Sequence, residues 1–269
     1  MLVNSVNHRK DRSMEKTIFI TGAASGIGRE TALLFAERGW FIGLFDLNDE
    51  GLKEVASEIG EDRCCYAKLD VTKAESYKTA VAHFLKHTNG SMNALFNCAG
   101  IMRMGPFDEL TMKDHEITLD INVKGIIVGI DASLDALKAT PNSCILSMSS
   151  ASAFYGVPDL SVYSASKFAV RGLTEALNIE FEKYDIRVTD LMPLYVNTPM
   201  ISSQTHQAGT LKFFGAKLTT RQIAELAWKA VHGKKVHWIP GGVLKALKVV
   251  SRLFPVAERP TMKFLNKLN

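Results

Sequence analysis

Short apolar runs alternate with amphipathic segments along most of the chain. Strands are predicted where a short apolar run is bounded by polar or turn residues, at 17–21, 40–45, 63–69, 93–97, 143–148 and 235–239. Helices are predicted where apolar residues recur three or four positions apart, at 29–38, 49–59, 73–88, 112–138, 161–184 and from Thr219 onward. This alternation predicts an α/β protein built on a parallel sheet.

The length and composition are those of an ordinary globular domain. The 269 residues are 46% hydrophobic and 22% charged, which allows a substantial core. No apolar run approaches the ~20 residues that cross a bilayer. Residues 1–15 are polar and lack the apolar centre of a secretory signal, so we expect a disordered leader before a single domain over 16–269. A cytoplasmic location is the resulting expectation.

The positive charge is concentrated near the C-terminus. Residues 234–269 contain eight Lys or Arg and one Glu, a net charge of +7, so residues 1–233 carry −3 of the overall +4. A nucleic-acid-binding protein would more naturally carry basic residues across its folded body. The distribution therefore argues against nucleic acid as a partner.

The basic C-terminal segment, residues 243–269, begins with an amphipathic pattern. On a helical wheel of 244–254, Lys245, Lys248 and Arg252 share one side and apolar residues the other. Two interpretations stay open. The apolar face packs on the body or on a second subunit, or the helix makes peripheral contact with an anionic membrane surface.

The four cysteines are Cys64, Cys65, Cys98 and Cys144. None belongs to a Cys-x-x-Cys pair or stands near a His at zinc-ligand spacing. We therefore predict free thiols and no metal site.

A glycine-rich turn follows the first predicted strand and precedes a helix. It contains Gly22, Ser25, Gly26, Ile27 and Gly28, with the spacing Gly-x-x-x-Gly-x-Gly. Glycines let the backbone approach a pyrophosphate, whose charge would lie against the helix N-terminus. The turn therefore predicts a dinucleotide site, with a purely structural tight turn as the alternative.

Asp46 ends the next predicted strand, about 20 residues beyond the glycine turn, where dinucleotide-binding folds place the residue that contacts the adenosine ribose. A carboxylate there accepts hydrogen bonds from the ribose hydroxyls and repels a 2′-phosphate, so we predict NAD(H). Ser25 offers no cation to such a phosphate. The alternative is that Asp46 caps the following helix.

Further cofactor contacts are predicted at the ends of the third and fourth strands. Asp70 and Val71 are suitably placed for the adenine edge. Asn97, Ala99 and Gly100 put small residues where the backbone of the cofactor would pass. Both positions lie at the carboxyl ends of strands, where open α/β sheets bind ligands.

Tyr163 and Lys167 stand four residues apart in a helical segment, so both side chains project from one face. A phenol beside an ammonium can donate and accept a proton, and the positive charge would lower the pKa of the phenol. Ser150, after the fifth strand, could hydrogen-bond the same reacting oxygen. Asn122 is polar within an apolar run, which fits either a satisfied buried amide or a role in holding a water.

Together these motifs resemble the short-chain dehydrogenase/reductase family in its single-domain form. The match covers residues 17–198 and includes, in order, Thr21-Gly-Ala-Ala-Ser-Gly-Ile-Gly28, Asp70-Val71, Asn97-Cys-Ala-Gly100, Asn122, Ser150 and Tyr163-Ser-Ala-Ser-Lys167. The resemblance implies a Rossmann fold with a seven-stranded parallel sheet and helices on both faces. It also implies a nicotinamide cofactor and a small-molecule alcohol or carbonyl substrate.

The resemblance further implies a catalytic tetrad of Asn122, Ser150, Tyr163 and Lys167. Tyr163 would be the acid/base. Lys167 would lower the pKa of Tyr163 and hold the nicotinamide ribose, while Ser150 would orient the substrate oxygen. Asn122 would support a water that leads to Lys167.

The sequence departs from the family pattern at two places. Cys98 stands where the family usually has a second Asn, and Leu194 replaces a glycine near the nicotinamide. Val196 and Thr198 still match positions that hold the carboxamide. The leading hypothesis is an NAD(H)-dependent oxidoreductase, and Leu194 motivates the alternative of a non-catalytic dinucleotide-binding redox sensor or interaction protein.

Residues 201–215 are mainly polar, with Phe213 and Phe214 inserted, and we expect a lid over the active site at about 199–217. Together with the amphipathic C-terminal segment, the lid favours an apolar substrate that is lipid-, steroid- or retinoid-like. A homodimer or homotetramer formed through the helices at 112–138 and 161–184 is typical of the family.

Overall fold

The computed structural model describes residues 15–242, 256 and 258–267. The predicted leader, apart from Glu15, and the amphipathic pattern at 244–254 lie outside the described residues. Among the helices of the described ranges, none is both long enough and apolar enough to cross a membrane.

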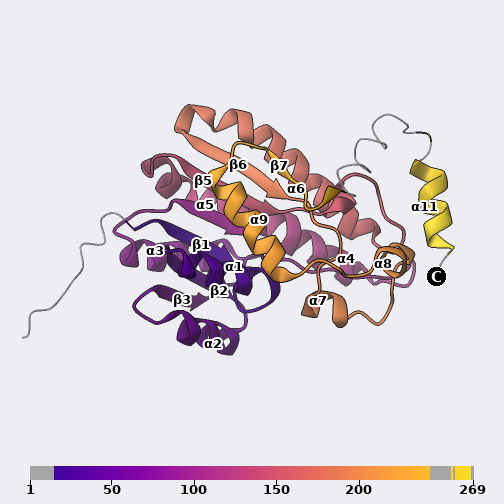
Figure 1. The fold of residues 1–269 in the computed structure, drawn as a ribbon, viewed down its shortest axis with the longest axis horizontal. Helices are drawn as coiled ribbons and strands as arrows, with labels where there is room; N and C mark the ends of the chain where they lie inside the picture. Colours follow the sequence, from indigo (N-terminus) through magenta and orange to yellow (C-terminus); the bar gives the residue numbers. More distant parts are fainter. Residues whose placement is uncertain (1–14, 243–255, 257, 268–269) are drawn as a thin grey trace, which may run out of the picture.

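Seven parallel strands form one sheet, in the order β3-β2-β1-β4-β5-β6-β7 (Figure 1). The strands are β1 (Thr17–Thr21), β2 (Phe41–Asp46), β3 (Cys64–Lys68), β4 (Ala94–Asn97), β5 (Ser143–Met148), β6 (Ile186–Leu191) and β7 (His237–Trp238). In register, Ile18 of β1 pairs with Ile42 on one side and with Ala94 on the other. The predicted seven-stranded parallel sheet is confirmed. The strand order reverses between β1 and β4, which is where open α/β sheets bind ligands.

Helices cover both faces of the sheet. They are α1 (Gly26–Glu37), α2 (Asp49–Ile59), α3 (Ala74–His87), α4 (Met112–Leu119), α5 (Gly125–Ala139), α6 (Ser161–Glu180), α7 (Pro199–Ser202), α8 (Gly209–Phe214), α9 (Thr220–His232) and α11 (Glu258–Asn266). Buried residues of α1, α2 and α9 form the core on one face, and those of α3, α5 and α6 form the core on the other. The apolar strands are buried between these layers, as a parallel sheet requires.

Several predicted boundaries differ from the structure. The helix predicted at 112–138 is α4 and α5 joined by a π-helical turn, Asp120–Lys124. The helix predicted at 161–184 ends with a short 3₁₀ turn at Glu182–Tyr184. The strand predicted at 235–239 shortens to the two residues of β7. The apolar pattern did not locate β6, because its sequence, IRVTDL, mixes apolar residues with Arg187, Thr189 and Asp190.

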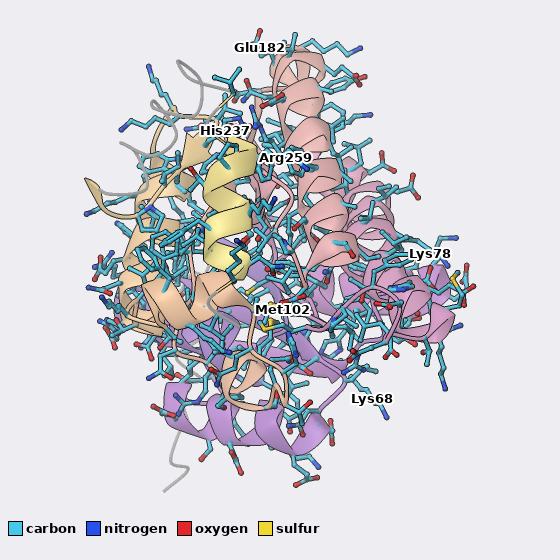
Figure 2. The ribbon with its side chains drawn as sticks, turned by 90° about the vertical axis from the view of Figure 1, so that its right-hand side faces the viewer. Lys68, Lys78, Met102, Glu182, His237 and Arg259 are labelled. Carbon is cyan, nitrogen blue, oxygen red and sulfur yellow. The ribbon has the colours of Figure 1, made fainter. Side chains whose placement is uncertain are left out.

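The segment predicted as a lid folds into two short helices, α7 and α8. Both lie with α11 at one side of the molecule, on the right of Figure 1. Figure 2 views that side and shows α11 in front. Leu265 of α11 is buried, and α11 contacts α8 directly. The last helix therefore packs against the predicted lid.

Candidate active site

A cavity of about 590 Å³ lies at the carboxyl ends of the strands. Gly22 follows β1, Asp46 ends β2, Cys98 follows β4, Ser149 follows β5, and Pro193 follows β6; all five line the cavity. Ligands of open α/β sheets bind at this edge. The fold therefore gathers residues that are far apart in the sequence into one site.

The glycine turn forms one wall of the cavity, and its shape depends on the absence of side chains. Gly22 and Gly26 have φ angles of 69° and 55°, in the left-handed region that favours glycine. A Cβ on Gly28 would lie 2.1 Å from the carbonyl oxygen of Gly22. Helix α1 begins at Gly26, so its free N–H groups face the cavity. This glycine cradle fits a dinucleotide pyrophosphate.

The Asp46 carboxylate is held in place by backbone donors at the end of β2. The N–H of Ala24 donates to Oδ2 at 3.2 Å, and the N–H of Asn48 donates to Oδ1 at 3.0 Å. Asn48, rather than Asp46, caps α2, since its side chain accepts from Gly51 N–H. Asp46 therefore lines the cavity with a fixed orientation. The alternative of a helix-capping Asp46 is wrong, because Asn48 occupies that position.

Other predicted cofactor residues also line the cavity. They are Gly22, Ser25, Gly26, Ile27, Gly28, Asp70, Val71, Ala99, Gly100, Val196 and Thr198. Leu194, which replaces the usual glycine, lines it as well. The Asp70 carboxylate accepts from the backbone N–H and the hydroxyl of Thr72, which fixes its position.

Asn97 is placed differently from the other predicted cofactor residues. Its side chain is buried and accepts a hydrogen bond from the Tyr77 hydroxyl at 3.2 Å. It is absent from the lining of the main cavity. Asn97 therefore supports the end of β4, and a direct contact with the cofactor stays a prediction.

Lys167 lies at the floor of the cavity and is 3% exposed. Its ammonium donates to the carbonyl oxygen of Met148 at 2.8 Å. Burial lowers the pKa of Lys167 to about 8, and the nearby Cys98 opposes this shift. The ammonium lies 5.4 Å from the centre of the Tyr163 ring. The structure therefore brings the two residues of the Tyr-x-x-x-Lys pair together in one cavity.

The direction of the Tyr163 pKa shift corrects the sequence-based expectation. We expected Lys167 to lower the pKa of the phenol. Burial instead raises the pKa of Tyr163 to about 12; hydrogen bonding with Ser150 lowers it in part, and Tyr195 raises it further. Burial disfavours the phenolate more than the neighbouring groups stabilise it. The phenol of Tyr163 is therefore protonated near neutral pH.

Ser150 follows β5 and caps the short 3₁₀ turn Ala151–Ala153. The N–H of Ser152 donates to Ser150 Oγ at 3.1 Å, which fixes the hydroxyl on the cavity wall. Ser149, its neighbour, uses its hydroxyl to donate to the carbonyl of Lys167. Of the two adjacent serines, Ser150 is the one whose hydroxyl interacts with the phenol of Tyr163.

Asn122 lies in the π-helical turn and is fully buried. Its side chain accepts from the N–H of Ile101 at 2.9 Å, and donates to the carbonyl of Ile101 at 2.9 Å and to Ser166 Oγ at 3.2 Å. These three bonds tie α4 and α5 to the loop after β4 and to α6. Because of these bonds the polar groups of the Asn122 side chain are satisfied within the protein. Asn122 does not line the cavity.

The far half of the cavity is mainly apolar. Side chains from α7, α8, α11 and the loops form its wall: Met102, Phe154, Val157, Tyr195, Ile201, Thr210, Phe214, Met262 and Leu265. Met102 is labelled below α11 in Figure 2. Of the two lid phenylalanines, Phe214 lines the cavity whereas Phe213 is exposed. This mainly apolar part of the cavity lies beside Tyr163.

The sequence patterns missed several of these wall residues. Tyr195 donates to or accepts from Thr210 at 2.7 Å, which joins the loop after β6 to α8. Met262 and Leu265 come from the C-terminal helix, about 100 positions after Tyr163. Helix α11 is itself amphipathic, which indicates that one of its faces packs against the protein. No pattern in the sequence indicates that this face lines the cavity.

A family model described as short chain dehydrogenase matches residues 16–209. Oxidoreductase UcpA of Salmonella typhimurium is 37% identical over 196 residues, covering 72% of this chain and 74% of the relative. The trans-4-hydroxycyclohexanecarboxylate dehydrogenase of Sinomonas cyclohexanicum is 32% identical over 224 residues, covering 80% and 85%.

Solved structures share the architecture. The 3-ketoacyl-(acyl-carrier-protein) reductase of Brucella melitensis, complexed with NADH, has a TM-score of 0.76 at 27% identity, covering 84% of this chain and 96% of that one. The alcohol dehydrogenase of Thermococcus sibiricus, complexed with 5-hydroxy-NADP, has a TM-score of 0.74 at 26% identity, covering 84% and 95%.

Proposed function

Because the chain belongs to the short-chain dehydrogenase family, we propose that it is an NAD(H)-dependent enzyme that interconverts a secondary alcohol and its carbonyl compound. One observation carries the proposal. Tyr163, Lys167 and Ser150 line a single cavity whose other half is a glycine cradle. The first set of groups suits proton transfer to oxygen, and the second suits a dinucleotide.

A nicotinamide dinucleotide would supply the hydride acceptor or donor. The glycine cradle and the first turn of α1 would bind its pyrophosphate, and Asp46 its adenosine ribose. Asp70 and Val71 would lie at the adenine, and Val196 and Thr198 at the carboxamide.

The preference for NAD(H) over NADP(H) rests on charge. The Asp46 carboxylate accepts backbone hydrogen bonds that hold it at the cavity wall. Among the described residues that line the cavity, Lys167 is the one cation, and it lies at the floor beside Tyr163. A 2′-phosphate near Asp46 would meet a negative charge without a lining cation to offset it.

The chain's own part in the reaction is proton transfer and positioning. In carbonyl reduction Tyr163 donates its phenol proton to the substrate oxygen, and in alcohol oxidation it accepts that proton. Ser150 hydrogen-bonds the same oxygen. Lys167 keeps two N–H groups beyond the one that Met148 accepts, and these are available to a ribose. Asn122 holds the loop after β4, and a water-supporting role toward Lys167 is part of the proposal.

We further propose an apolar substrate. The wall built by α8 and α11 presents mainly apolar side chains, which suits lipid-, steroid- or retinoid-like compounds as well as simple cyclic alcohols. The name of the Sinomonas relative, which is a dehydrogenase of a cyclohexane alcohol, makes cyclic secondary alcohols a first choice for a substrate panel.

Two surface features support the partners that we propose. Leu119, Ile127, Phe168 and Ile179 are exposed apolar residues on or beside α4, α5 and α6, which suits a homodimer or homotetramer formed through these helices. Near the C-terminus, Phe264 is 61% exposed. Sedimentation of the full chain with anionic but not with neutral vesicles, weakened by Phe264→Ser, would support peripheral membrane contact.

The test begins with fluorescence titration of NADH and NADPH, followed by turnover of cyclic and linear apolar alcohols and ketones. We expect tighter binding of NADH, and an Asp46→Ser variant in which the difference shrinks. Tyr163→Phe should reduce turnover about 100- to 10,000-fold while leaving NADH binding intact. Equal binding of both cofactors would refute the role of Asp46, and unchanged turnover in Tyr163→Phe would refute the catalytic assignment. Binding without turnover across the panel would favour the redox-sensor alternative, and Leu194→Gly would then be the next variant.

A further inference from the structure

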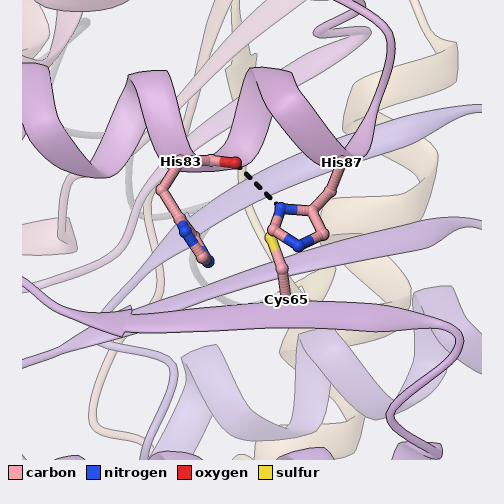
Figure 3. A group of neighbouring side chains, drawn as sticks. All are labelled: Cys65, His83 and His87. Carbon is pink, nitrogen blue, oxygen red and sulfur yellow. Dashed lines mark hydrogen bonds between the residues drawn. The ribbon is translucent and has the colours of Figure 1, made fainter.

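Cys65 of β3 and two histidines of α3 face one another at the edge of the sheet (Figure 3). One ligand atom from each of Cys65, His83 and His87 lies within 4.8 Å of the other two. His83 and His87 are four positions apart, so they project from the same face of α3 toward the strand. Their separation from Cys65 in the sequence matches no zinc motif, and only the packing of α3 on β3 brings them together.

The hydrogen bonds of this cluster leave ring nitrogens available. His87 Nδ1 lies 2.9 Å from the backbone carbonyl oxygen of His83, which can only accept (Figure 3). Nδ1 therefore carries the proton, and Nε2 of the neutral ring keeps its lone pair. Such a carbonyl is a typical outer partner of a metal-binding histidine, because it sets the tautomer and the orientation of the ring.

His83 provides the second observation. Its Nε2 is buried and has no hydrogen-bond partner among the residues that the structure describes. A buried polar atom without a partner is costly, and its presence in a folded protein calls for an explanation. A bound cation would supply the missing partner.

We propose that Cys65, His83 and His87 bind one divalent cation of the zinc type. One thiolate and two imidazoles are the ligands that Zn²⁺ prefers, whereas Mg²⁺ and Ca²⁺ prefer oxygen ligands. Bond lengths of ~2.0–2.3 Å in a tetrahedron place ligand atoms roughly 3.5 Å apart, so the side chains need to move inward by about 1 Å. The exposed His87 leaves the fourth position to water, and the Cys65 proton is released to solvent on binding.

The location indicates what the cation does. None of the three residues lines the cavity of the candidate active site. Cys65 lies near the amino end of β3, which is an edge strand of the sheet. A cation held between β3 and α3 would fasten this edge strand to the helix that covers it. The site is thus structural, and hydride transfer does not depend on it.

The neighbouring thiol offers a matched control. Cys64 precedes Cys65 on the same strand, but it packs in the core on the other face of the sheet. Cys64→Ala and Cys65→Ala remove equal side chains from adjacent buried positions, and only the second removes a proposed ligand. His87→Gln tests a ligand on the exposed side, where a substitution does not disturb the core.

The experiment is a titration of the reduced, tag-free full chain with Co²⁺, followed by visible and near-ultraviolet absorption. We expect one equivalent to bind, with tetrahedral d–d bands and a thiolate-to-cobalt charge-transfer band, and Zn²⁺ to displace it. Cys64→Ala should keep both signals, Cys65→Ala should lose the charge-transfer band, and His87→Gln should bind at least about tenfold more weakly.

A thermal measurement reports on the same site without cobalt. Zn²⁺ at a hundredfold excess over its Kd should raise the Tm of the chain and of Cys64→Ala by roughly 5 °C or more, and the same Zn²⁺ concentration should raise the Tm of His87→Gln by about half as much or less. The proposal is overturned if Co²⁺ fails to saturate below about 1 mM. It is also overturned if Cys64→Ala and His87→Gln respond to metal alike, because the ion would then lie elsewhere.

Discussion

Gly209→Ala is the substitution that most directly tests the role of α11 in the apolar half of the cavity, where we propose that the substrate binds. A Cβ on Gly209 would lie 2.0 Å from the carbonyl oxygen of Leu265 and 3.0 Å from its carbonyl carbon. Both are backbone atoms that cannot rotate away, so one helix has to move. Helix α8 is held by the buried Leu211 and by the bond between Thr210 and Tyr195. We therefore expect α11 to move.

The expected size follows from Leu265, which is the buried side chain of the described part of α11 and is 4% exposed. Burying a Leu side chain contributes about 1.5–3 kcal/mol. Losing about 2 kcal/mol of this contact reduces the equilibrium constant for docking of α11 roughly 30-fold. A nine-residue helix has little stability by itself, so undocked α11 should also unfold.

Two measurements check the Gly209→Ala result. Amide hydrogen exchange in α11 should accelerate by about the same 30-fold factor, and the KM for large apolar substrates should increase while the Kd for NADH stays constant. Gly172→Ala is the control: a Cβ there meets no atom within 4 Å, and Ala stabilises a helix interior by about 0.5–1 kcal/mol. If exchange and KM in Gly209→Ala equal those of Gly172→Ala, the reasoning about α11 is refuted.

Three further substitutions test the cavity floor, the sheet edge and the glycine cradle. Burial lowers the pKa of Lys167 to about 8, so the unfolded chain binds this proton more tightly than the folded protein, and the free energy of unfolding should increase as pH increases from about 8 toward 10.5. Denaturant unfolding at pH 7.5 and at pH 9.5 should show this increase to be about 2 kcal/mol smaller in Lys167→Met than in the unchanged chain. The same increase in both proteins would contradict a buried Lys167 ammonium. Asp190 is fully buried, and its carboxylate bonds to His237 Nδ1 at 2.9 Å. His237→Ala should therefore lower the free energy of unfolding by about 3–5 kcal/mol, because it leaves a buried carboxylate unpaired, and adding Asp190→Asn should recover part of that loss. Urea unfolding measures both, and a double variant whose loss is the sum of the two single losses would contradict this pairing. Gly28→Ala places a Cβ against the carbonyl oxygen of Gly22, and overpacking of this kind costs ~1–3 kcal/mol. We therefore expect the Kd for NADH, measured by fluorescence titration, to increase at least about fivefold. An unchanged Kd would show that the glycine cradle does not hold the cofactor.

The half of the cavity that contains the glycine cradle, where we propose that the cofactor binds, was predictable because its signals are local. A strand, a glycine turn and a helix follow one another within about twenty residues, and two of those glycines do adopt positive φ. Asp46 could be placed by its distance from that turn. Because each parallel strand delivers its carboxyl end to the same edge of the sheet, the order of motifs along the chain was enough to bring them together.

The substrate half could not be predicted in this way, since its contacts join distant parts of the chain. Leu265 packs on Gly209, and Tyr195 bonds Thr210, by side-chain and backbone fit that no periodicity reports. The Cys65 cluster was missed for the same reason, because motif spacings describe ligands on one turn or hairpin. Position along the sequence predicts which edge a residue reaches, but not which helix closes over it.

Burial shifts the pKa values of Tyr163 and Lys167 in opposite directions, and both shifts favour the uncharged form. Both side chains share a buried space that opposes a charge on either one. Near pH 7 a phenol with a pKa of about 12 is protonated, while Lys167, with a pKa of about 8, still carries most of its proton. The site thus presents a proton donor, which carbonyl reduction requires. Alcohol oxidation requires the phenolate first, and the free energy of forming it falls by about 1.4 kcal/mol for each unit of pH. On the mechanism that we propose, carbonyl reduction would use this protonated phenol near neutrality, and alcohol oxidation would become easier as the solution becomes alkaline.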